Sequence, residues 1–280
     1  MIKGPPPWER LAYKTCTNKH ACMFSGQGAE DRFTFEHFFS KEPFLRNGTF
    51  VEMGAVDGVL YSNTLFFERI LGWSGLLVEP SPRLIPALRR NRGQNDRNLV
   101  VNAAVCATEG MVEWWDVPKN PTVSGIRASM PDGVILDSAG HVAFGGTARG
   151  TLPHRTNITC EPLTALLRKA GIIRINLFSL DVQGAELSVL STMNWSIPID
   201  VLIVEQDGLD AAKDHAVRSL LRSHDYHYSG RLGFNWSNEV WLSREFQQIH
   251  PPPSGSRHHG HDSVASWTSR GRMCFFDACL

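Results

Sequence analysis

The sequence lacks the features that assign a chain to a membrane, to secretion or to nucleic acid. No apolar stretch approaches the roughly 20 residues that a membrane-spanning helix needs, and the start of the chain has no apolar core of the kind found in signal peptides. The 28 basic and 28 acidic residues cancel, so no overall field attracts nucleic acid or an anionic membrane. We therefore expect a cytoplasmic protein with no nucleic-acid partner and no membrane insertion, unless an upstream targeting segment sends it to the secretory pathway.

The sequence lacks the cysteine spacing of the common zinc motifs. The six cysteines contain no Cys-x-x-Cys pair, and we predict free thiols in a reducing compartment. In an oxidising compartment, Cys16 can pair with Cys22, and Cys274 with Cys279. Asn-x-Ser/Thr sequons give weak support to that second case, because such short motifs often arise by chance. They begin at Asn47, Asn157, Asn194 and Asn235.

The length and composition fit one large α/β domain with tails. The chain has 280 residues, of which 42% are hydrophobic and 20% charged, as in an ordinary globular core. We expect a lead-in over 1–45, with a helix at 33–39 packing across one sheet edge. The domain itself then spans 46–244, interrupted by an irregular insertion or lid loop at 120–155. A proline- and histidine-rich stretch predicts a flexible tail over 245–280.

Apolar runs alternate with helix-like patterns through the domain. Such alternation predicts a mostly parallel sheet with helices on both faces. An added strand is expected at 111–117, and the last two strands can form an antiparallel edge pair. Five arginines near the second helix are expected to lie on a solvated face; they are Arg83, Arg89, Arg90, Arg92 and Arg97. The strands are expected at 49–54, 75–79, 98–105, 157–160, 175–181, 199–205, 226–230 and 238–243, and the helices at 61–71, 82–92, 161–170, 184–194 and 209–223.

The most informative motif is the strand end Glu52-x-Gly54 followed by Asp57-Gly58. Strand, glycine turn and helix N-terminus together predict a nucleotide-binding turn. A dinucleotide fingerprint would read G-x-G-x-x-G, and Asp57 would repel a pyrophosphate. An acid in this position suits an ammonium or sulfonium group, and S-adenosylmethionine carries both. A plain turn without a ligand remains an alternative, whereas a nicotinamide dehydrogenase is disfavoured.

Two more strand ends continue the pattern. Glu79 ends the second strand and can accept both ribose hydroxyls of a nucleoside, while Pro80 stops that strand. Asn102 and Ala103 end the third strand, where we expect them along the adenine edge; alternatively, Asn102 is a turn or cap residue. Three acids at the carboxyl ends of apolar strands, Glu52, Glu79 and Asp181, are expected to meet in one crevice of the sheet.

The fourth and fifth strands also end in acids. Asp181 can bind the amino group of the ligand, orient the acceptor or take a proton from it, while Glu186 is expected as a helix N-terminal acid. Glu205 and Asp207 should lie near Asp181 if the two strands are neighbours. Carboxylates so placed can hold a divalent cation, but no third ligand is evident, and we predict a site without metal.

The combination of these motifs resembles the FkbM-type, S-adenosylmethionine-dependent methyltransferases. The similarity covers roughly residues 47–243, and the run from Ser62 to Glu79 is especially similar to the eukaryotic subgroup that contains the Star protein. One difference is Gln183, which stands where the family usually has glutamate. The matching segments are Phe50–Gly58, Ser62–Thr64, Leu77–Pro80, Val101–Val105 and Leu180–Glu186.

The resemblance implies a fold, a reaction and a set of site residues. The fold is a Rossmann-like class I methyltransferase fold with a mostly parallel seven-stranded sheet and a final antiparallel strand. The reaction is chiefly O-methylation, with a hydroxyl of a small molecule or glycan as acceptor. Catalysis is expected from Asp181 as base or orienter, with Glu205 assisting. A non-catalytic, Star-like binding or trafficking module is the alternative. The cofactor-binding residues implied are Glu52, Gly54, Ala55, Asp57, Gly58, Ser62, Asn63, Glu79, Pro80, Asn102, Ala103 and Asp181.

Overall fold

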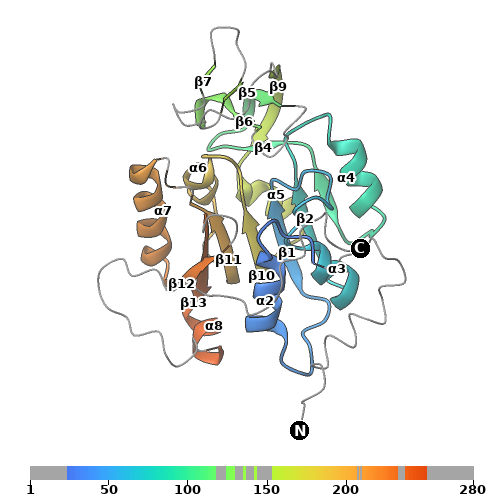
Figure 1. Ribbon diagram of the computed structural model, residues 1–280, viewed down its shortest axis with the longest axis vertical. Coiled ribbons are helices and arrows are strands. Elements are labelled where there is room, and N and C mark those ends of the chain that lie inside the picture. The colour runs from blue at the N-terminus through green and yellow to red at the C-terminus, as the bar shows by residue number, and fades with distance from the viewer. Residues whose placement is uncertain are drawn as a thin grey trace.

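A central seven-stranded sheet organises the computed structural model, as predicted (Figure 1). Its strand order is β12-β13-β11-β10-β1-β2-β3, and all neighbours are parallel except the two pairs that involve β13. The structure describes residues 24–117, 124–129, 135–136, 142–143, 153–206, 208, 210–232 and 237–250. The strands are β1 (Thr49–Met53), β2 (Ser74–Val78), β3 (Leu99–Val101), β10 (Ile175–Leu180), β11 (Ile199–Glu205), β12 (Tyr226–Leu232) and β13 (Asn238–Ser243).

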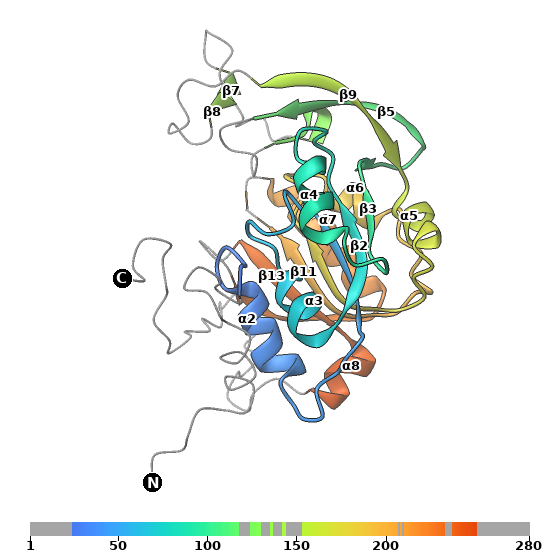
Figure 2. The ribbon, with the colours of Figure 1, turned by 90° about the vertical axis from the view of Figure 1, so that its right-hand side faces the viewer.

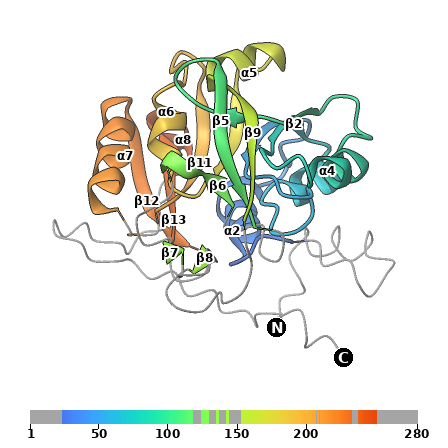
Figure 3. The same cartoon turned by 90° about the horizontal axis from the view of Figure 1, so that it is seen from above.

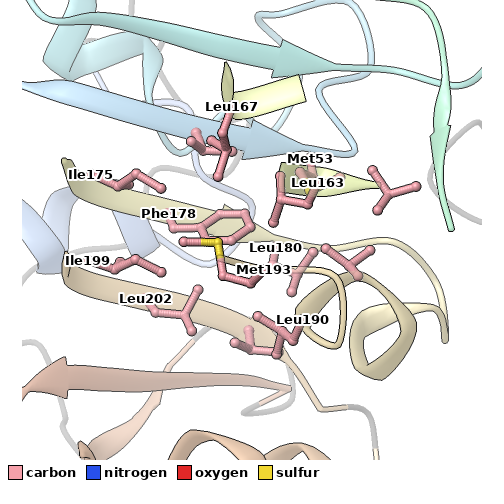
Figure 4. Packing of buried hydrophobic residues seen from close by; sticks show 14 of the residues in the cluster. Met53, Leu163, Leu167, Ile175, Phe178, Leu180, Leu190, Met193, Ile199 and Leu202 are labelled. Carbon is pink, nitrogen blue, oxygen red and sulfur yellow. The ribbon is translucent and has the colours of Figure 1, made fainter. Parts of the chain in front are cut away.

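Helices cover both faces of this sheet because its strands are apolar on both sides. On one face, Phe178 and Leu202 pack with leucines of α5 and α6 and with Met193 (Figure 4). On the other face, Leu177 and Val201 pack with a phenylalanine-rich layer. The first face carries α5 (Leu163–Lys169), α6 (Glu186–Leu190) and α7 (Ala211–Ser223); the second carries α2 (Glu30–Thr34), the π-helix η1 (Phe35–Phe39), α3 (Leu65–Leu71), α4 (Ile85–Arg92) and α8 (Arg244–Ile249).

The segment that precedes β1 belongs to the core. A helix at 33–39 was predicted, and the structure has helical residues from Glu30 to Phe39. The predicted position across a sheet edge is wrong, because Phe35 and Phe38 are buried in the cluster that covers the sheet face. Figure 2 shows α2 on one side of the sheet and α5 on the other. None of the described helices is long and apolar enough to cross a membrane.

A second, four-stranded sheet extends from the end of β3. Seen from above, β5 and β9 cross the molecule between α7 and α4 (Figure 3). The region 120–155 was expected to lack regular structure, but its described residues include β6, the short hairpin β7–β8 and the start of β9. The sheet has the order β4-β9-β5-β6 and contains β4 (Ala104–Val105), β9 (His154–Glu161), β5 (Gly110–Asp116) and β6 (Gly125–Ile126); η3 (Arg127–Ser129), β7 (Ile135–Leu136) and β8 (Val142–Ala143) complete the region.

A disulfide bond closes this second sheet. The prediction of free thiols is wrong for Cys106 and Cys160, which are bonded with their α-carbons 5.7 Å apart. The parallel pairing of β4 with β9 brings the two residues together although 54 residues separate them in sequence. The other four cysteines lie outside the described residues.

Reduction of this disulfide should destabilise the chain. A crosslink over a loop of this length limits the unfolded ensemble and is typically worth about 2–4 kcal/mol. We expect dithiothreitol to lower the free energy of unfolding of the wild-type chain by that amount in urea titrations. The Cys106→Ala/Cys160→Ala variant should have the lower value with or without dithiothreitol. Equal wild-type curves under both conditions would show that the bond adds nothing.

Candidate functional site

Five polar or glycine positions form one row at the carboxyl edge of the central sheet. Met53 is the register partner of both Leu180 and Val78, Val78 pairs with Val101, and Leu180 with Val204. The next residues along these strands are Gly54, Glu79, Asn102, Asp181 and Glu205. The chain order reverses between β1 and β10, which is where such sheets bind ligands. The strand ends with Glu79 and Asp181 therefore lie in one row, whereas Glu52, which was expected among them, stands two residues before Gly54 inside β1.

Glu52 is buried and builds the turn that follows β1. Its Oε2 accepts hydrogen bonds from Ser62 Oγ at 2.8 Å and Thr64 Oγ1 at 2.7 Å. Its Oε1 accepts one from the backbone N–H of Asn63 at 2.7 Å. The carboxylate thus satisfies donors that would otherwise be orphaned just before α3. Glu52 and Ser62 therefore hold the turn between β1 and α3 from the interior of the protein.

Arg92 is the cation that balances this buried acid. The prediction of a solvated face is wrong for it, since its side chain is 0% exposed. Its guanidinium donates to Glu68 Oε2 at 2.6 Å and to the Gly58 carbonyl at 3.0 Å, and lies 3.5 Å from Glu52 Oε2. A guanidinium has five donors in a rigid fork, so it can hold several chain segments at once.

The two motif glycines are required by the packing of the chain itself. Gly54 has φ 79°, and an added Cβ would lie 2.1 Å from the Asp181 carbonyl oxygen. Gly58 has φ 81°, and its Cβ would lie 2.5 Å from Arg92 Cγ. Their freedom in the left-handed region thus lets β1 approach β10 and lets the turn close over Arg92.

The turn between these glycines is held by its own polar groups. Asp57 Oδ1 accepts from the N–H groups of Val59 at 2.9 Å and Leu60 at 2.8 Å. Asn91 of α4 donates to the Asp57 carbonyl at 2.9 Å. Val56 has φ 51°, a strained value for a β-branched residue. Strain of this kind is often found where a backbone is shaped for a ligand.

Glu79 presents a buried carboxylate at the end of β2. Oε2 accepts from the N–H of Val56 at 2.8 Å, and Oε1 from the N–H of Ser81 at 2.8 Å. Burial raises the pKa of Glu79 to about 8, and the charge of Asp116 adds to the shift. Arg83 bonds to Asp116, with its Nε 2.7 Å from Oδ2, and opposes the shift. Each carboxylate oxygen of Glu79 keeps a lone pair for a further donor.

The neighbouring predicted residues shape the same turn. Asn102 Nδ2 donates to the carbonyls of Glu79 at 2.9 Å and Pro80 at 2.8 Å. The turn role that was left open for Asn102 is therefore observed. Pro80, Ala55 and Ala103 are buried, so their side chains pack inside the protein.

The acids at the ends of β10 and β11 are joined by an amide. Gln183 Nε2 donates to Asp181 Oδ1 at 2.8 Å and to Glu205 Oε2 at 3.1 Å. Glu186 begins α6 as predicted, and its Oε1 accepts from the N–H of Gly184 at 3.0 Å. Asp207 lies outside the described residues.

Helix α2 brings a buried acid to this edge that we did not predict. Glu30 is 2% exposed, and its Oε1 accepts from Asn238 Nδ2 at 3.1 Å. Burial raises the pKa of Glu30, and the charge of Asp181 raises it further. The segment before α2 is joined to the turn between β1 and α3, since Gly26 forms a β-bridge with Tyr61. Acids at a helix start are common for dipole reasons, so the sequence held no distinctive signal.

The described residues include no group of three or more His, Cys, Asp or Glu side chains arranged to hold a metal ion. The groups at the edge are instead oxygen acceptors and amides. Such a set can accept hydrogen bonds from ribose and acceptor hydroxyls, and its negative charge can attract an ammonium or sulfonium group.

Comparison with known proteins adds a family match. The family described as methyltransferase FkbM domain matches residues 52–228. No curated protein matches the chain. Among solved structures, the METTL16 MTase domain (crystal form 2) aligns at 11% identity and a TM-score of 0.42. The alignment covers 77% of this chain and 66% of the METTL16 chain, so this chain spans slightly less than two thirds of the METTL16 chain.

Two further structures are similar at a comparable level. The ribosomal protein L11 methylase from Lactobacillus delbrueckii subsp. bulgaricus aligns at 11% identity and a TM-score of 0.38, covering 78% of each chain. A SAM dependent methyltransferase from Aquifex aeolicus aligns at 8% identity and a TM-score of 0.36, over 86% of this chain and 98% of that one.

The raised pKa of Glu79 predicts a pH-dependent stability. The folded chain holds this proton more tightly than the unfolded chain, so its contribution is fully present below the ordinary value of 4.5 and is lost as the pH rises through about 8. Glu79→Gln removes that contribution. We expect the free energy of unfolding of the variant, minus that of the wild type, to increase between pH 5 and pH 9 in urea titrations. Parallel pH profiles would contradict the shift.

Proposed function

The chain belongs to the FkbM methyltransferase family and has the Rossmann-like class I methyltransferase fold, and we propose that it methylates a hydroxyl group of a sugar or small metabolite with S-adenosylmethionine. The observation that supports this most is the row of Gly54, Glu79, Asn102, Asp181 and Glu205 at the switch point of the sheet. Nucleotides bind at this point in open α/β sheets.

The residues at this edge fit the adenosyl group. Glu79 is fixed by two backbone N–H groups and keeps acceptor capacity for two ribose hydroxyls. Asn102 holds the turn over which the adenine would lie, beside Pro80 and Ala103. A raised pKa on a buried acid is typical of a functional site, and hydroxyl donors would stabilise the charged form of Glu79.

The turn after β1 would face the methionine end of the cofactor. Gly54, Ala55, Asp57 and Gly58 shape its backbone, and Asn63 lies at its end. Asn63 has a buried Oδ1 that accepts no hydrogen bond from any residue that the structure describes. We assign Glu52 and Ser62 an indirect role, because their polar groups are engaged in holding the turn.

Asp181 is the residue to which we assign the catalytic role. When bound, S-adenosylmethionine would supply an electrophilic methyl group, and its sulfur would keep the electron pair of the broken C–S bond. Asp181 then orients the acceptor hydroxyl and takes its proton as the new O–C bond forms, with Glu205 assisting. Holding the two reactants in line contributes on the order of 7–11 kcal/mol. A general base adds about 10²–10⁴-fold.

Asp181→Asn tests this assignment with little change in shape. Asparagine keeps the oxygen that accepts from Gln183 but cannot take a proton. We expect methyl transfer to fall about 10²–10⁴-fold, and the affinity for S-adenosylhomocysteine to change by less than severalfold in calorimetry. Transfer is followed with methyl-tritiated S-adenosylmethionine on glucose, galactose, mannose and rhamnose. Full activity in the variant would reject the role of Asp181.

Cofactor binding itself separates the enzyme from the alternative of a non-catalytic, Star-like module. Calorimetry of the full chain with S-adenosylmethionine should give a one-to-one binding curve. Absence of heat at high micromolar cofactor would favour the module. The Star-like subgroup and the cytoplasmic location both remain predictions.

A further inference from the structure

The turn between β10 and α6 holds one side chain in a conformation that its residue type rarely adopts. Gln183 has φ 54°, and Gly184 follows with φ 99°. A left-handed glutamine costs free energy, so its surroundings must hold it in place. Within the turn, Glu186 Oε1 accepts from the N–H groups of Val182 at 3.3 Å and Gly184 at 3.0 Å.

A buried ion pair connects this turn to α7. Glu186 Oε2 lies 2.7 Å from Lys213 Nζ of α7, and both side chains are largely shielded from water. One oxygen of Glu186 therefore binds the turn while the other binds α7. This arrangement fixes the backbone of residues 182–184 and, with it, the direction of the Gln183 side chain.

The Gln183 amide occupies the place between two carboxylates. Its Nε2 is 2.8 Å from Asp181 Oδ1 and 3.1 Å from Glu205 Oε2. An amide nitrogen has two hydrogens, so one can point to each acid. Two carboxylates on neighbouring strands repel each other unless one takes up a proton, and a divalent cation bound by both oxygens is another means of holding such a pair. Here a neutral donor stands in that position.

We propose that Gln183 is a positioning residue that takes the place of a divalent cation between Asp181 and Glu205. It orients Asp181 toward the acceptor hydroxyl and makes methyl transfer independent of metal. The inference rests on the proposed function for its catalytic consequence. Its geometric part, a cation position filled by an amide, can be tested without any acceptor.

Gln183→Glu is the direct test, because it replaces the amide with a third carboxylate of the same shape. Three carboxylates are hard oxygen ligands suited to Mn²⁺, Mg²⁺ or Ca²⁺. We expect the variant to bind about one Mn²⁺ per chain with a Kd on the order of 10⁻⁴ M, measured by electron paramagnetic resonance. The wild type should bind none at that concentration. Gln248→Glu makes the same charge change at an exposed position of α8 and should also bind none.

Activity gives the second readout. Wild-type methyl transfer to the monosaccharides named above should be unchanged by EDTA, whereas transfer by Gln183→Glu should be lost in EDTA and partly restored by Mn²⁺. The affinity for S-adenosylhomocysteine should stay within severalfold in both proteins. If the wild type transfers no methyl group at all, the proposed function fails, and the Mn²⁺ titration still decides the geometric claim.

Three results would overturn the proposal: a folded Gln183→Glu chain that binds no Mn²⁺, a wild-type chain whose transfer requires a cation, or a Gln183→Glu enzyme as active in EDTA as the wild type. If Gln183→Glu does not fold, Gln183→Asn serves instead. Its amide is one methylene shorter and reaches only one of the two acids, so we expect kcat to fall about tenfold with unchanged cofactor affinity. An unchanged kcat there would contradict the positioning role.

Discussion

The buried ion pairs of Arg92 are the constraint on which the site depends. Its guanidinium contacts Glu68 of α3, Glu52 of β1 and the carbonyl of Gly58, which lies in the turn between β1 and α3. Removing one partner of a buried pair costs about 3–5 kcal/mol, because the other charge is left uncompensated. Strand, turn and two helices are thus fixed together by contacts within the chain.

The same constraint separates Glu52 from the acids that follow the strand ends. Glu52 lies within β1 and its carboxylate holds the turn. Glu79 and Asp181 each follow the last residue of β2 and β10 that pairs with Met53 of β1. The two acids differ in how many partners they have: Glu52 accepts three hydrogen bonds and lies beside Arg92, whereas Glu79 accepts two, one on each oxygen. Gln183 joins the ends of two strands, because its amide donates to both Asp181 and Glu205.

Much of the framework could be predicted from sequence, because apolar runs that end in acids mark parallel strands and their carboxyl edge. The tertiary partners could not. Arg92 lies among other arginines on α4, and periodicity does not say which one turns inward. The Cys106–Cys160 bond depends on the pairing of β4 with β9, which crosses an irregular region. Glu30 lies outside the family match and is brought to the site only by the packing of α2.

A crystal structure of the full chain with S-adenosylhomocysteine tests the central claim most directly. We expect both ribose hydroxyls to donate to the Glu79 carboxylate and the sulfur to face Asp181 across the end of β1. A nucleoside bound elsewhere, with Glu79 still enclosed by the Val56 and Ser81 N–H groups alone, would contradict it.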